Sequence, residues 1–169
     1  MADNEKIVVF AGTYGSLHEA ELDFQTIKDL HKEKSVGKYE AAVFTKQDDG
    51  SVKIIDTDAT SRSKGLKIGA VAGAVVGILF PPSLIVGAIA GGGVGLMAGH
   101  FSKGLKRGDI KELGELLDDG QAGIVFVGVV TPGQSIDHLL RHALKTMTKQ
   151  VDTNAEDVKK AIGEAGTQS

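Results

Sequence analysis

The sequence of 169 residues has no cysteine and no tryptophan, and it has only two tyrosines and three prolines. Without cysteine, the chain forms no disulfide and no thiolate metal or redox site, which suits a reducing compartment. The formal net charge of −3 and the lack of a long basic run disfavour nucleic-acid binding. So few large aromatic rings also leave few platforms for stacking single-stranded bases.

Recognisable catalytic arrangements are absent as well. No Ser-His-Asp or Cys-His arrangement is supported, so we expect no enzymatic activity and no cofactor. The polar start Met1–Lys6 leads into a short apolar run, Ile7–Phe10, without a basic region and a long apolar core, so no signal peptide is expected. The length predicts one domain, or one domain plus an appendage, and it allows a real hydrophobic core.

Apolar periodicity predicts strands separated by amphipathic helices. Ser16 and Glu19 have the spacing of a capping box, followed by an apolar stripe of Leu17, Leu22, Phe24, Ile27 and Leu30. Asp49-Gly50 is a strong hairpin signal. The expected strands are 6–14, 39–46, 51–58 and 122–130, and the expected helices are 16–34, 109–120, 135–147 and 156–164.

This order of elements favours an α+β fold, a ferredoxin-like split βαβ domain interrupted by an insert and followed by C-terminal helices. Residues 1–60 would form its first half and residues 108–131 its second half. Residues 61–107 would be a glycine-rich helical hairpin insert, and residues 132–169 would hold C-terminal helices and a polar tail. The fold by itself implies no function.

The insert has almost no charge and repeats glycine at every fourth position on both sides of two adjacent prolines. Glycines at this spacing lie along one side of a helix and let helix backbones approach closely. The pattern predicts a glycine-zipper hairpin that turns at the prolines. Its residues are Gly65, Gly69, Gly73, Gly77, Pro81, Pro82, Gly87, Gly91, Gly95 and Gly99.

Eight helical glycines cost roughly 6–8 kcal/mol relative to alanine, so lipid or dense packing in an oligomer must offset them. The uncharged first arm, Ile68–Phe80, would be about 20 Å long, whereas a bilayer core is roughly 30 Å thick. The second arm, Ser83–Phe101, is longer. A hairpin that enters and leaves on one side, without crossing completely, fits these lengths best.

Basic residues flank both ends of the hairpin, which predicts that both ends lie in the cytoplasm and contact anionic head groups. They are Arg62, Lys64 and Lys67 before it, and Lys103, Lys106 and Arg107 after it.

These features favour a non-enzymatic protein at the inner face of the cytoplasmic membrane, whose hairpin drives membrane insertion and homo-oligomerisation. Two alternatives stay open. In one, the protein is cytoplasmic and its hairpins form the core or shell of a soluble multimer. In the other, it is a membrane-anchored sensor that binds a small ligand through the amides of the loop Ala11–Ser16.

Two stretches carry a resemblance to a known family: "KGLKIGAVAGAVVGILFPPSLIVGAIAGGGVGLMAGHFSKGL" and "IKELGELLDDGQAGIVFVGVV". They resemble the DUF1269 family of bacterial and archaeal proteins, usually labelled predicted membrane proteins. The resemblance implies a membrane location and no established enzymatic activity. Relatives named as general stress proteins imply a link to the stress response. The double proline and the extended polar C-terminus depart from common members.

The remaining candidate residues favour structural roles. His138 and His142 lie four apart in a predicted helix, a spacing that can place two metal ligands on one face. No third ligand accompanies them, so we expect surface histidines and no metal site. Asp48 belongs to the predicted turn, and Gly120 lies where a helix end favours a left-handed residue.

Overall fold

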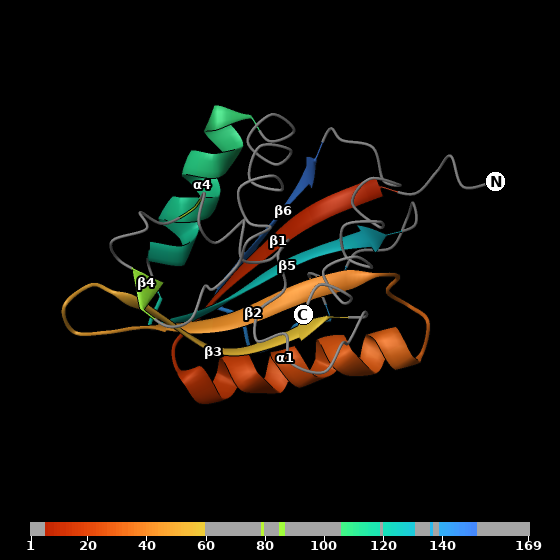
Figure 1. Cartoon of the computed structure of the whole chain (residues 1–169), viewed down its shortest axis with the longest axis horizontal. Coiled ribbons are helices and arrows are strands. Elements are labelled where there is room, and N and C mark those ends of the chain that lie inside the picture. The colour runs from red at the N-terminus through yellow and green to blue at the C-terminus, as the bar shows by residue number, and fades with distance from the viewer. Residues whose placement is uncertain are drawn as a thin grey trace, which may run out of the picture.

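The computed structural model describes residues 6–59, 79, 85–86, 106–118, 120–130, 136 and 139–151. In these residues the chain is a mixed α/β protein, a sheet with two helices packed on it (Figure 1). The helices are α1 (Leu17–Lys32) and α4 (Arg107–Asp118). The strands are β1 (Lys6–Tyr14), β2 (Tyr39–Lys46), β3 (Val52–Ala59), β4 (Ile85–Val86), β5 (Ala122–Val130) and β6 (Lys145–Val151).

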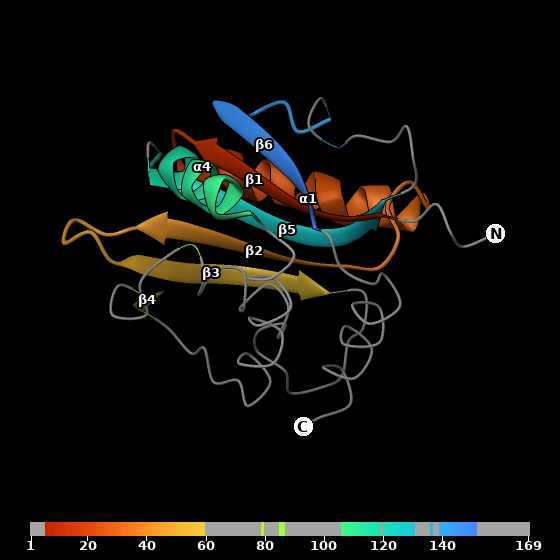
Figure 2. The ribbon, with the colours of Figure 1, turned by 90° about the horizontal axis from the view of Figure 1, so that it is seen from above.

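The sheet has the strand order β4-β3-β2-β5-β1-β6. Its five long strands are all antiparallel to their neighbours, and only the two-residue β4 pairs in parallel, with the start of β3. Figure 2 shows β6 at one margin of the sheet and β3 with β4 at the other. β1 and β2, which α1 connects, run parallel to each other because β5 pairs antiparallel with both.

Each face of the sheet carries one of the two helices and its own apolar core. Alternate residues of a strand point to opposite faces, so the continuous apolar runs of β1 and β5 serve both cores. The α4 side includes Ile7, Val9, Ala11, Phe44, Val125, Val127, Leu113, Leu116 and Leu117. The α1 side includes Val8, Phe10, Tyr14, Ala20, Phe24, Ile27, Tyr39, Ile124 and Phe126.

The start of α1 confirms the predicted cap. The Ser16 hydroxyl accepts a hydrogen bond from the Glu19 amide at 3.3 Å, and Ser16 itself is extended. Leu22 was expected in the buried stripe but is 42% exposed, because it lies off the face that Ala20 and Phe24 share at helical spacing. The helix ends at Lys32, earlier than expected.

The hairpin between β2 and β3 also forms as predicted. Gly50 has φ of 85°, and its amide donates to the Gln47 carbonyl at 3.0 Å. The Asp49 carboxylate accepts from the hydroxyl of Ser51 at 2.6 Å and from its amide at 2.9 Å. These bonds hold the pKa of Asp49 below its usual range, so the turn is fixed by its own side chains.

The ferredoxin-like topology is not confirmed. In that fold the first and third strands are central and both helices cover one face, whereas here β2 and β5 are the inner pair and α1 and α4 lie on opposite faces. Two short crossovers of the same hand would bring both helices to one face. The connection from β3 to α4 runs over residues 60–106, and we attribute the difference to that length.

The helix predicted at 135–147 is wrong in all of its described residues, because residues 136 and 139–144 form bends, turns and irregular chain and Lys145 begins β6. β6 pairs with β1 without interruption from Thr13↔Lys145 to Ile7↔Val151. Residues 145–151 alternate with period two, with Met147 and Val151 against the α4-side core. The expected helix at 156–164 lies outside the described residues.

All ten glycines and prolines assigned to the hairpin lie outside the described residues. Of the predicted arms, the structure describes Leu79 and Ile85–Val86. Leu79 packs against the α4-side core. Ile85–Val86 was expected to be helical but forms β4 beside β3, where the edge of the sheet offers backbone hydrogen bonds. Both sides of the predicted turn therefore contact the domain.

α4 begins two residues earlier than expected, and its apolar face of Leu113, Leu116 and Leu117 is confirmed. The Lys106 carbonyl accepts from the Ile110 amide at 3.1 Å, so the helix starts before the expected residue 109. Gly120 is not left-handed. A Cβ there would lie 1.8 Å from the Thr13 hydroxyl oxygen, so glycine is required by the close approach to β1.

Candidate functional site

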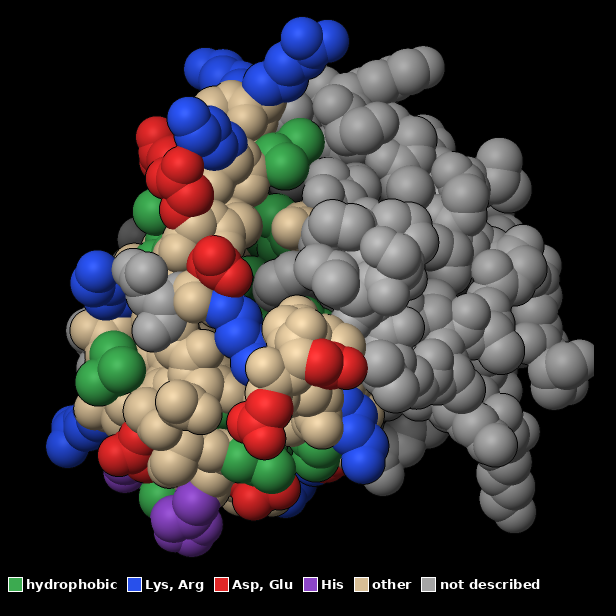
Figure 3. Space-filling view, turned by 90° about the vertical axis from the view of Figure 1, so that its left-hand side faces the viewer, with side chains coloured by type: hydrophobic (Ala, Val, Ile, Leu, Met, Phe, Trp, Pro, Cys, Tyr) green, Lys and Arg blue, Asp and Glu red, His purple; other side chains and the backbone are tan. Residues whose placement is uncertain are grey.

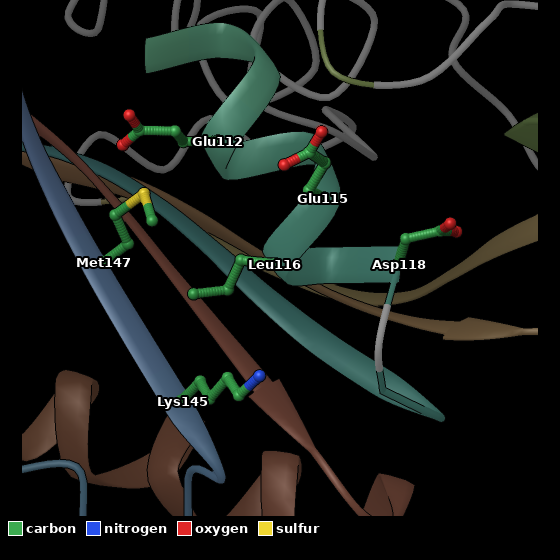
Figure 4. A pocket seen from close by; sticks show the side chains of 6 residues that line it. All are labelled: Glu112, Glu115, Leu116, Asp118, Lys145 and Met147. Carbon is green, nitrogen blue, oxygen red and sulfur yellow. The ribbon is translucent and has the colours of Figure 1, made fainter. Parts of the chain in front are cut away.

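A shallow open groove of about 540 Å³ lies between α4 and β6. Figure 4 shows three carboxylates along α4 and two residues of β6 around it. Residues 112, 115 and 118 follow one another at intervals of three, which places them on one side of the helix. The lining residues are Glu112, Glu115, Leu116, Asp118, Lys145 and Met147.

Ion pairs join α4 to two strands of the sheet, β6 and β2. Lys149 of β6 places its Nζ 2.7 Å from Glu112 Oε2 and 3.4 Å from Asp109 Oδ1. The hydrogen bond to Glu112 holds the pKa of Lys149 above its ordinary value. Lys46 of β2 places its Nζ 2.7 Å from Asp118 Oδ1 and also donates to the Asp118 carbonyl. The two lysines therefore neutralise most of the negative charge on the side chains of α4.

The groove combines an apolar floor with charged walls. Its floor is formed by Leu116 and Met147, and its polar groups are carboxylates and lysines. In the described parts of the chain, no group of three or more His, Cys, Asp or Glu side chains could hold a metal ion. The ion pairs of Glu112 and Asp118 fix α4 on the sheet.

A buried carboxylate on the other face of the sheet is the second candidate. Asp23 of α1 is 1% exposed. Its Oδ1 lies 2.7 Å from Nδ1 of His142, and its Oδ2 accepts from the His142 backbone amide at 3.1 Å. These two contacts join α1 to the turn that precedes β6, across 119 positions of sequence.

Tyr14 lies close to this pair and is fully buried. Burial raises the pKa of its hydroxyl far above the ordinary value, and the negative charge of Asp23 acts in the same direction. The Tyr14 hydroxyl lies near enough to Asp23 for their interaction to raise this pKa, although it forms no hydrogen bond of ordinary geometry in the described structure. The neutral phenol is thus a poor acid at neutral pH.

An Asp–His pair can orient an imidazole for base catalysis, and half of the His142 side chain is exposed. The described residues place no partner at hydrogen-bonding distance of its other nitrogen. The two contacts with Asp23 make the pair a joint between α1 and the turn before β6. Sequence reasoning treated His142 as a surface histidine. The available signal was Asp23, a carboxylate at helical spacing with Ala20 and Ile27.

The loop proposed as an anion cradle is already occupied by the chain itself. Residues up to Tyr14 belong to β1, and Ser16 caps the helix. The Glu19 carboxylate reaches to within 3.3 Å of where a Cβ of Gly15 would lie. A carboxylate in the first turn of a helix interacts favourably with the helix dipole, so Ser16 and Glu19 both contribute to the start of α1.

Two of the six predicted basic residues lie in the described structure, at the start of α4. Lys106 and Arg107 are both exposed. Figure 3 shows blue side chains gathered at the top of the molecule, the end at which α4 begins. The other four, Arg62, Lys64, Lys67 and Lys103, lie outside the described residues, as does His138.

Fold and site together define a mixed α/β protein with an open antiparallel sheet, a helix on each face and a long glycine-rich insertion between β3 and α4. Residues 67–163 match the family model described as "Protein of unknown function (DUF1269)". This match covers more than half of the chain, and the protein belongs to the DUF1269 family, as the resemblance predicted.

No curated protein and no solved structure matches the chain. Among the described residues, none of the helices has the length and apolar character needed to span a bilayer.

Proposed function

We propose that this protein is a non-enzymatic, membrane-associated protein that self-associates through its glycine-rich segment, residues 61–107. The domain would lie on the cytoplasmic side, with the segment inserted into, or against, the inner face of the membrane. The supporting observation is that the segment interrupts a single folded body. β3 leads into it, α4 leads out of it, and both belong to one sheet and core. A hairpin that enters and leaves on one side meets this constraint.

The basic residues at the start of α4 support the same proposal. Lys106 and Arg107 are exposed at the start of α4, where the segment ends in the sequence. A lysine or arginine near an anionic bilayer surface contributes about 1 kcal/mol to binding. Removing both charges should therefore weaken binding about 30-fold, and reversing them should weaken it further.

Flotation of the full chain with lipid vesicles tests membrane association. We expect the protein to float with vesicles containing phosphatidylglycerol and to resist a carbonate wash. The variant Lys106→Glu/Arg107→Glu should bind less, whereas the charge-matched control Lys34→Glu/Lys38→Glu, at exposed positions, should bind nearly as the wild type. Protein that stays entirely in the unbound fraction would rule out the proposal. Equal loss in both variants would show that net charge, not this end of α4, governs binding.

The mass of the assembled protein separately tests whether the glycines mediate self-association. Gly73→Leu and Gly91→Leu should each reduce the assembled mass in the medium in which assembly occurs, because leucine prevents close backbone approach. Val75→Leu and Ile89→Leu introduce the same residue at intervening positions and should leave the mass unchanged. If both glycine variants keep the native mass, the glycine-zipper interpretation is wrong.

A soluble assembly is the second candidate, and one observation favours it. Leu79 and Ile85–Val86, on both sides of the predicted turn, contact the domain itself. These contacts place the described residues of the segment against protein and not lipid, as a soluble assembly requires. This alternative predicts a large species without detergent. Light scattering that gives a monomer mass without detergent would exclude it, whereas detergent-dependent recovery would favour the membrane proposal.

A further inference from the structure

The contacts of Asp23 fix both the position and the tautomer of the His142 imidazole. Oδ2 of Asp23 accepts from the His142 backbone amide at 3.1 Å, and Oδ1 lies 2.7 Å from the ring nitrogen Nδ1. An ionised carboxylate only accepts hydrogen bonds, so the ring donates through Nδ1. In the neutral imidazole the lone pair therefore lies on the other nitrogen, Nε2.

The turn that carries His142 is anchored on both sides of that residue. Leu140 is buried in the α1-side core, and the Leu144 amide donates to the Thr13 carbonyl at 2.8 Å. Asp23 is itself held on α1 and is 1% exposed. Because ring and carboxylate are both fixed by the fold, they need no reorganisation when charge develops on the ring.

The outer side of the same ring is open to solvent. The His142 side chain is 46% exposed, and no other residue of the described structure lies at hydrogen-bonding distance from the ring. The preceding residue, Arg141, is exposed as well. Nε2 therefore offers its lone pair to solvent, while the opposite side of the ring is bound to a buried negative charge.

This arrangement favours attack by Nε2 on an electrophile. When Nε2 forms a new bond, the ring becomes a cation and keeps its proton on Nδ1. A carboxylate bound to Nδ1 stabilises such a cation, and burial of Asp23 strengthens the interaction. No second base is needed, because the attacking nitrogen carries no proton. The pair thus has the parts of a nucleophile and of the group that activates it.

The other described histidines have only part of this arrangement. His18 is exposed on α1, but in the described parts of the chain no carboxylate is bound to its ring. Nδ1 of His31 lies 3.0 Å from the Val36 carbonyl, which is a neutral acceptor, and this ring is half-buried. His142 is therefore the described imidazole that combines a carboxylate partner with an open Nε2.

We propose that His142 is a phosphoryl-acceptor site, modified at Nε2 by small donors with a labile phosphorus–nitrogen bond, and that Asp23 is its positioning residue. Phosphoryl transfer requires little of the acceptor beyond a well-placed nucleophile. The negative charge of the product stays in solvent, and the Nδ1 proton stays on the ring beside Asp23. The site lies in the described domain and depends neither on the glycine-rich segment nor on membrane binding.

The transfer balances without a further reactant. The bond from Nε2 to phosphorus forms, the phosphorus–nitrogen bond of the donor breaks, and its electron pair leaves with the donor nitrogen. With phosphoramidate as the probe, that nitrogen already carries three protons in the zwitterion, so the products are phosphohistidine and ammonia.

Incubation of the full chain with potassium phosphoramidate tests the proposal. Peptide mapping gives the rate at each histidine, and phosphorus NMR distinguishes Nε2 from Nδ1 as the modified atom. We expect His142 to react at least about tenfold faster than His18, the effect of one hydrogen bond to a charged group. Equal rates at the two residues, or attachment to Nδ1 of His142, would overturn the proposal.

Asp23→Asn tests the positioning role, with His18 as a control inside the same molecule. The variant should lower the rate at His142 to about that of His18 and leave the rate at His18 unchanged. His142→Gln should remove the fast-forming product alone. An unchanged ratio of the two rates in Asp23→Asn, with native circular dichroism, would contradict the role of the carboxylate.

Unfolding the wild type provides a second measurement, which does not depend on how well Asp23→Asn folds. In guanidinium chloride the contacts of Asp23 with His142 are lost, so the ratio of the rates at His142 and His18 should fall to about one. A ratio that is the same in the folded and the unfolded chain would show that neighbouring residues in the sequence, and not Asp23, govern the reactivity.

Discussion

Substitution of His142 tests how strongly the Asp23–His142 pair joins α1 to the turn before β6. In His142→Ala, the carboxylate keeps the backbone amide at 3.1 Å and loses the imidazole at 2.7 Å. Breaking a fully buried pair on one side costs about 3–5 kcal/mol. The His142 side chain is 46% exposed, so water can reach the vacated position. We therefore expect His142→Ala to lower the free energy of unfolding by about 1.5–3 kcal/mol, the value of one hydrogen bond to a charged group.

A double-mutant cycle isolates this interaction from the general effect of truncation. In the background of Asp23→Ala, which has no carboxylate to satisfy, His142→Ala should cost less than about 0.5 kcal/mol. The coupling free energy should then be at least about 1 kcal/mol. His18→Ala, at an exposed position of α1, is the matched control and should change stability by less than about 0.5 kcal/mol.

Urea unfolding followed by far-UV circular dichroism suits this protein, because it has no tryptophan to report by fluorescence. Equal slopes for all variants would show that the same surface is exposed on unfolding. Measurements at several protein concentrations separate the contribution of assembly. A coupling free energy within about 0.3 kcal/mol of zero, the additivity limit, would refute the assignment of the pair as a structural joint.

Three further substitutions test the packing and electrostatics of the domain. Gly123→Ala should lose about 1–3 kcal/mol of stability, because a Cβ would lie 2.4 Å from the Phe44 ring; a loss below about 0.5 kcal/mol would mean that the ring moves aside freely. Ser16→Ala should lose about 1 kcal/mol and Ser16→Asp much less, since aspartate also caps a helix; equal losses would contradict the cap. The pKa of Lys149 is raised on folding, so its contribution is complete below the unfolded pKa and is lost as pH rises through the folded pKa. The stability difference between wild type and Lys149→Met should therefore be constant from neutral pH to about pH 10 and shrink at higher pH, and a difference that persists there would exclude the bond to Glu112 as its cause.

Local signals predicted most of the sheet. The strands at 6–14, 39–46 and 122–130 have the expected bounds, because their apolar runs are long and end at polar or turn residues. The cap at Ser16 and the turn at Gly50 also form as expected, since each depends on residues within a few positions. The family, too, was identified from its sequence pattern alone.

Long-range pairing could not be predicted in the same way. Whether residues 145–151 become helix or strand depends on β1, which offers them an edge more than 130 positions away in sequence. The role of Asp23 depends on His142, and the need for glycine at 120 depends on the approach of Thr13. The helical spacing of Asp23 with Ala20 and Ile27 indicates that it is buried, but nothing local indicates the partner of Asp23 or of Gly120.

Residues that are neighbours in the sequence establish which segments are apolar, where they turn and where charge is excluded. The strand order, the placement of the helices on opposite faces and the contact of Leu79 and Ile85–Val86 with the domain are visible in the folded chain alone. Those features depend on which distant segment pairs with each edge of the sheet and which packs on each face. Both depend on the packing of the whole chain.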